Sequence, residues 1–90
     1  MHANSVYAIL KAFLSQLTGR STFEITAGQS LTGNPPAGLG FTDAGLLALA
    51  QAINLAFRDA GTPLHPPLLP SDTSGAGTVS DLYDLIKTRV

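Results

Sequence analysis

The sequence Leu39-Gly40-Phe41-Thr42-Asp43-Ala44 leads directly into a long apolar segment, which continues to Phe57. A threonine hydroxyl can accept a hydrogen bond from the unpaired backbone N–H groups at a helix start, and an aspartate in the first turn favours the positive end of the helix dipole. Glycine is common directly after a helix end. We therefore expect a helix that begins at Thr42 or Asp43 and is stopped by Gly61.

Apolar residues also recur every three or four positions in a segment near the N-terminus, from Ser5 to Thr18. That spacing places them on one side of an α-helix. Asn4 or Ser5 can cap the start of this helix, and Gly19 suits its end. The apolar residues of the segment are Val6, Ile9, Leu10, Phe13, Leu14 and Leu17.

A third helix is expected near the C-terminal end, beginning at Thr78. The Thr78 hydroxyl can cap it, and Asp81 stands three residues later, as in a capping box. Lysine and arginine near its end favour the negative end of the helix dipole. The inner side of this helix consists of Val79, Leu82, Leu85 and Ile86.

Two connecting segments lack a helical pattern of this length. In residues 20–41 we expect Phe23, Ile25 and Leu31 to pack into the core from an ordered loop. The second segment, residues 61–77, is rich in proline, which interrupts helices because it lacks an N–H group and fixes φ. There we expect one short turn of helix, around Leu68 and Leu69. The expected fold class is therefore all-α, in a single domain.

The composition narrows the classes of protein that fit this chain. It has 90 residues, of which 44 % are apolar, enough for one small core. The absence of cysteine and of a signal-peptide pattern fits a cytoplasmic location. The five basic residues are scattered, so we expect that the protein does not bind nucleic acid. No apolar run approaches the roughly 20 residues of a membrane span, so we expect no membrane span. Because only 12 % of residues are charged, part of the surface is expected to bind a partner.

The order of these elements and two short motifs resemble the acyl carrier protein family. In that family Leu-Gly-x-Asp-Ser-Leu opens the second helix, so setting Leu39-Gly40 on its Leu-Gly places Asp43 at the serine and Phe57 at the phenylalanine that often ends the helix. Residues 78–82 resemble the Thr-Val-x-Asp-Leu start of the family's last helix. For residues 1–90 the resemblance implies one acyl-carrier-protein-like bundle of three main helices, with a short extra helix and a long first loop.

The resemblance also implies a cofactor site in which the reactive residue is missing. In carrier proteins the serine hydroxyl holds a phosphopantetheine arm, whereas Asp43 has no hydroxyl that could attack coenzyme A. Thr42 has a hydroxyl one position early, and Ala44 marks the site if the register is shifted by one. We therefore predict no cofactor, and phosphopantetheine only if the chain is a carrier whose serine was changed or misaligned.

The long helix is also the part of a carrier protein that partner enzymes recognise. In the register above, Leu47, Ala50 and Ile53 take inward positions. The outward positions are Ala44, Ala48, Gln51, Asn54 and Leu55. These are uncharged, unlike the acidic helix of typical carriers, so a partner would be recognised by shape and apolar contact. The residues expected to bind this partner are Phe41, Leu46, Ala48, Gln51 and Leu55.

Three hypotheses for function follow. The first is a docking or scaffolding module without the phosphopantetheine serine, which binds a synthase or acyltransferase component in fatty-acid, polyketide or peptide synthesis. The second is a genuine acyl carrier protein, and the third is a helical adaptor that forms a homodimer. No motif supports an enzyme or a metal site, because His2 and His65 have no partner at ligand spacing and the serines have no triad-like setting.

Overall fold

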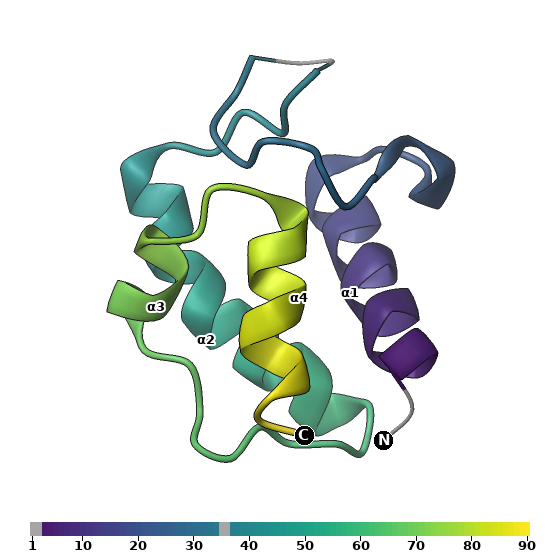
Figure 1. The fold of residues 1–90 in the computed structure, drawn as a ribbon, viewed down its shortest axis with the longest axis vertical. Helices are drawn as coiled ribbons and strands as arrows, with labels where there is room; N and C mark the ends of the chain where they lie inside the picture. The colour runs from purple at the N-terminus through teal and green to yellow at the C-terminus, as the bar shows by residue number, and fades with distance from the viewer. Residues whose placement is uncertain (1–2, 35–36) are drawn as a thin grey trace.

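A computed structural model describes residues 3–34 and 37–90 of the chain. In these ranges the chain forms α1 (Ala3–Thr18), a 3-10 turn η1 (Thr22–Glu24), α2 (Asp43–Asp59), α3 (Pro70–Ser74) and α4 (Val79–Lys87). Figure 1 shows α4 between α1 on one side and α2 with α3 on the other. Extended pairing in the described residues is limited to isolated bridges, so the expected all-α class is confirmed.

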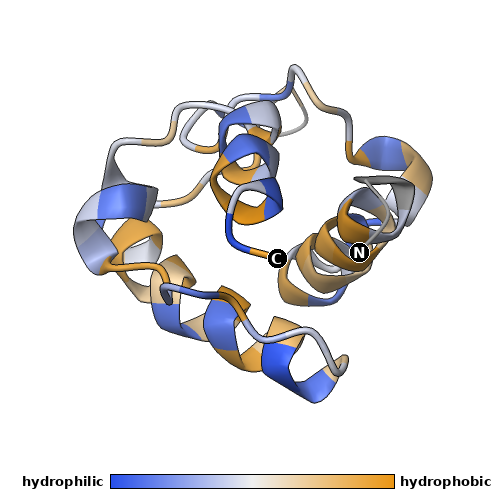
Figure 2. Ribbon diagram, turned by 60° about the horizontal axis from the view of Figure 1, so that its bottom comes forward, coloured by the Kyte–Doolittle hydropathy of each residue, from blue (hydrophilic) through white to orange (hydrophobic). Residues whose placement is uncertain are grey.

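One hydrophobic core lies between the three long helices. Each of them carries apolar residues at every third or fourth position and therefore buries one side. Figure 2 shows the resulting alternation of hydrophobic and hydrophilic residues along the ribbon. Phe57, near the end of α2, is the largest side chain that is fully buried. The other long-helix residues buried in this core are Val6, Leu10, Leu14, Leu46, Leu49, Ala50, Ile53, Val79, Leu82 and Ile86.

The ends of the helices follow the local signals in the sequence. Thr42 caps α2, since its Oγ1 accepts a hydrogen bond from the Gly45 N–H at 3.0 Å. Thr78 and Asp81 form the expected capping box at α4. Gly61, two residues after the end of α2, has a φ of 86°, in the left-handed region that glycine adopts without strain. In the described residues α1 already includes Ala3, so the expected start at Ser5 was wrong and Ser5 lies inside the helix.

The loop after α1 contributes two of the three expected core residues. Ile25 and Leu31 are buried, as predicted. Phe23 was placed wrongly, because 92 % of its surface is exposed. It lies in η1, a three-residue turn whose capping box joins Ser21 and Glu24. With about three residues per turn, this segment directs neighbouring side chains apart, and Ile25 alone reaches the core.

Hydrogen bonds tie this long loop to the starts of α2 and α4. The Leu31 N–H donates to the Gly77 carbonyl at 3.0 Å, just before α4. The Phe41 N–H donates to the Leu31 carbonyl at 2.9 Å, just before α2. The Arg20 Nη2 donates to the Gly38 carbonyl at 2.9 Å. The described part of the loop is therefore ordered, as expected, and it is bonded to the segments just before both helices.

The short helix in the connector lies later than expected. Leu68 and Leu69 precede α3, which begins only at Pro70, and Leu69 has an extended backbone. The residue before a proline is disfavoured in the helical region, whereas proline itself suits the first helical position. The predicted position around Leu68 and Leu69 was therefore wrong. α3 packs on α2, where the buried Thr73 hydroxyl donates to the Leu46 carbonyl.

Candidate functional site

The start of α2 is held at the surface by the ordered loop before it. Leu39 is buried and anchors this loop in the core. Gly40 has a φ of 73°, and its N–H donates to the Gly33 carbonyl at 2.9 Å. With these contacts the chain turns into α2 at the cap residue Thr42, and Asp43 becomes the first helical residue.

The three predicted cofactor positions lie together at this helix start. Thr42, Asp43 and Ala44 are all exposed. The Thr42 hydroxyl oxygen is engaged in the helix cap. The Asp43 carboxylate lies in the first turn, at the positive end of the helix dipole. The surface at this point therefore presents a carboxylate, and the neighbouring hydroxyl already has a structural role.

The exposed side of α2 differs by one residue from the expected one. Leu46 is only 4 % exposed, so it belongs to the core and its expected role in partner binding is corrected. Leu47 was expected to point inward but is 47 % exposed. Each residue turns the helix by about 100°, so the side that buries Leu46 must leave Leu47 outside. Ala50 and Ile53 are buried, as expected.

The other residues expected to bind a partner divide into two neighbouring surfaces. Phe41 and Ala48 line an apolar groove of about 180 Å³, together with Leu17 near the end of α1. Gly45, Leu49 and Ala52 complete this groove. Gln51 and Leu55 are exposed on the outward side of α2. This part of the surface is apolar or uncharged and continuous along the helix.

Asn54 was expected to face outward and instead holds the connector. Its Nδ2 donates to the Leu68 carbonyl and its Oδ1 accepts from the Leu68 N–H, both at 2.9 Å. An amide side chain can make this pair because it offers a donor and an acceptor side by side. The available signal was an asparagine in a largely apolar helix that is followed by a connector rich in proline, whose backbone forms few regular hydrogen bonds.

No protein-family model, no curated protein and no solved structure matches this chain. The resemblance to carrier proteins therefore stays a prediction, drawn from two short motifs and the order of the helices. None of the helices in residues 3–34 and 37–90 is long and apolar enough to cross a membrane.

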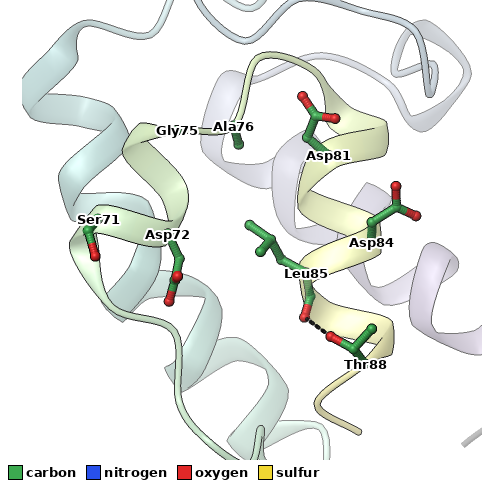
Figure 3. Close-up of a pocket in the computed structure, with 8 residues that line it drawn as sticks. All are labelled: Ser71, Asp72, Gly75, Ala76, Asp81, Asp84, Leu85 and Thr88. Atoms are coloured by element: carbon green, nitrogen blue, oxygen red, sulfur yellow. Dashed lines mark hydrogen bonds between the residues drawn. The ribbon is translucent and has the colours of Figure 1, made fainter.

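A second hollow lies between α3 and α4 and is lined by acidic residues (Figure 3). Each carboxylate has its own partner. Asp72 accepts from the Leu69 N–H and lies 3.6 Å from Arg89, and Asp84 lies 3.3 Å from Lys87. In the part of the chain that the structure describes, which leaves out His2, no group of three or more potential ligands could hold a metal ion. These carboxylates serve helix caps and surface ion pairs.

Asp81 gives this region a dependence on pH. Backbone N–H donation from Gly77 and Thr78 holds the pKa of its carboxyl below the ordinary value of 3.8. Because this pKa is lower in the folded state, the ionised Asp81 stabilises the protein at pH values above 3.8. The contribution is lost as the pH falls through the lower pKa of the folded protein. We expect Asp81→Asn to be less stable than the wild type at neutral pH, with the difference shrinking in acid. Urea unfolding of both proteins from neutral to acidic pH measures the difference in stability. A difference that stays constant with pH would contradict the expectation.

Proposed function

We propose that this protein is a carrier-like docking module that holds no phosphopantetheine and binds a protein partner through the exposed side of α2 and the loop before it. The partner would be a synthase or acyltransferase component of fatty-acid, polyketide or peptide synthesis. The observation that supports this most is the position of Asp43, an exposed carboxylate at the first residue of α2. In the carrier register this is the position of the serine.

The arrangement of the helices supports the carrier-like part of the proposal. The chain runs through a long helix, an ordered loop, a second long helix, a short helix and a last helix. A carrier protein is expected to have the same order. The short α3 packs against α2, and the long first loop is hydrogen-bonded to the segments that precede α2 and α4. On this basis we propose that the all-α fold is an acyl-carrier-protein-like bundle.

The exposed side of α2 supports the docking part. Leu47 and Leu55 are 47 % and 39 % exposed there, with the polar but uncharged Gln51 between them. The apolar groove at Phe41 and Ala48 lies beside them. A contiguous apolar surface on a soluble domain often marks an interaction site. A partner would therefore gain affinity from apolar contact and little from charge. The cytoplasmic location that we expect for such a module stays a prediction.

The proposal is tested by restoring the serine. We expect Asp43→Ser to accept phosphopantetheine from a broad-specificity transferase, because the change places a primary hydroxyl at the exposed first turn of α2. The wild type should remain unmodified. The intact mass of each protein after co-expression with the transferase shows whether it has been modified. Peptide mapping then locates the added group.

Ala44→Ser is the matched control, since it adds the same hydroxyl one position later on an equally exposed residue. We expect it to stay unmodified. Modification of the wild type would mean that the protein is a genuine carrier, with Thr42 as the first hydroxyl to examine. Rejection of both serine variants would contradict the carrier-like proposal.

A further inference from the structure

We infer that the outward side of α2 binds a second copy of this chain, with the two α2 helices antiparallel and their Gln51 residues facing each other on a two-fold axis. The inference rests on the proposed function, because it names a partner for the same side of α2. It also has a consequence for regulation, since self-association and binding of another partner would then compete.

α2 leaves one row of its residues exposed. Ala44, Leu47, Gln51, Leu55 and Arg58 are all exposed and follow one another at intervals of three, four, four and three residues. Residues with this spacing lie in one row along a helix. The buried residues of α2 lie on the opposite side, in the core. The stripe is therefore a row along the outward side of α2 that stays accessible to a partner.

The stripe has the same spacing on both sides of Gln51, with a leucine four positions away in each direction. Leu47 and Leu55 lie four positions to either side of it, and Ala44 and Arg58 lie seven positions to either side. A two-fold symmetric interface requires that if one residue contacts another, the reverse contact forms as well. Antiparallel pairing centred on Gln51 meets this requirement. It sets Leu47 of each copy at the level of Leu55 of the other.

The charges at the two ends of α2 favour this direction. Asp43 lies in its first turn, and Arg58 and Asp59 lie in its last. Antiparallel pairing brings Arg58 of one copy to the same flank of the helix pair as Asp43 of the other, and the small Ala44 leaves room for the long arginine side chain. Asp59 is level with Asp43 but lies toward the opposite flank, because successive residues are turned by about 100° around the helix. Parallel pairing would instead set the two Asp43 carboxylates at one level, at an end of α2 that has no basic residue in its first turn. Within its own chain Arg58 forms an exposed pair with Asp59 at 3.7 Å, a type of contact that contributes little and exchanges easily.

The antiparallel arrangement can be tested with single cysteines, because the chain contains none. Cα atoms that face each other across a packed helix pair are about 4–5 Å apart, within the reach of a disulfide. We expect Gln51→Cys to form a covalent dimer at least about tenfold faster than Ala8→Cys, an exposed position on α1 that reports random collision. Non-reducing electrophoresis after mild oxidation measures both rates.

Leu47→Cys and Leu55→Cys determine the direction of pairing. In the antiparallel dimer two identical cysteines at position 47 are about 12 Å apart along the helix, too far for a disulfide. We expect each variant alone to cross-link at the rate of the Ala8→Cys control, and an equal mixture of the two to cross-link rapidly. A rapid reaction of Leu47→Cys alone would indicate parallel pairing and overturn the inference. So would a rate for Gln51→Cys equal to that of the control.

These results are separate from the test of the proposed function. Cross-linking needs no transferase, and modification of Asp43→Ser in dilute solution needs no dimer. A modified Asp43→Ser protein with no cross-link through position 51 would leave the carrier-like proposal intact and remove the self-association. Cross-linking in a chain whose serine variants are never modified would support the self-association and contradict the carrier-like proposal. Circular dichroism of each variant confirms that a negative result comes from a folded protein.

Discussion

Phe57→Ala is expected to lower the free energy of unfolding by about 3–5 kcal/mol, because it removes a large aromatic side chain from a core that cannot fully close around the space. Phe57 is 0 % exposed, near the end of α2. A domain of 90 residues has a total stability of only about 5–13 kcal/mol. The variant should therefore unfold at much lower urea concentration or be partly unfolded in buffer, which circular dichroism measures.

Phe23→Ala is the matched control for this result. It removes the same side chain from η1, where 92 % of the residue is exposed. We expect a change within about 0.5 kcal/mol, as for most surface substitutions away from special contacts. Similar losses for the two variants would mean that Phe23 packs into the core after all, as the sequence suggested.

Gly38→Ala is expected to destabilise the protein by about 1–3 kcal/mol, because the added methyl group has no space. A Cβ at Gly38 would lie 2.3 Å from the Gly33 carbonyl oxygen and 2.4 Å from its carbon. These are backbone atoms, so relief requires the two loop segments to separate. Separation would disturb the hydrogen bond from Gly40 to Gly33 and so loosen the start of α2. Urea unfolding measures the loss of stability.

Gly28→Ala provides the comparison, since a Cβ at Gly28 meets nothing within 4 Å. The substitution should be neutral or stabilising by up to about 1 kcal/mol, because alanine restricts the unfolded chain. In the Asp43→Ser background, Gly38→Ala should also slow modification by the transferase, while Gly28→Ala should not. Equal effects of the two glycine variants on stability would contradict the close approach of the loop segments.

Much of the candidate site could be predicted because its signals are local. The exposed position of Asp43 follows from the cap at Thr42, and a cap depends only on residues within one turn. The symmetric stripe around Gln51 was not recognised in the sequence, since it becomes visible only when Leu46 and Leu47 are assigned to the correct sides of α2. The apolar groove also needed the structure, because it joins Leu17 to α2 across the fold.

The sequence by itself determined where α2 begins and ends and where α4 begins. Capping side chains, glycines after helix ends and prolines at first positions act within a few residues, so Thr42, Gly61 and Thr78 marked these boundaries correctly. Pro70 carries the same kind of information for the start of α3. These boundaries would be expected in any fold that contains these segments.

Only the tertiary structure decided which sides of the helices and which loop residues are buried. A helix as apolar as α2 offers more than one side to a core, and a change of one residue turns it by about 100°. Phe23 was misplaced because η1, a turn of three residues, leaves it exposed. α3 packs on α2 from further along the chain, and its Thr73 bonds to the Leu46 carbonyl across 27 positions of sequence. Asn54 likewise pairs with Leu68, 14 positions away, and no local pattern describes such contacts between distant segments.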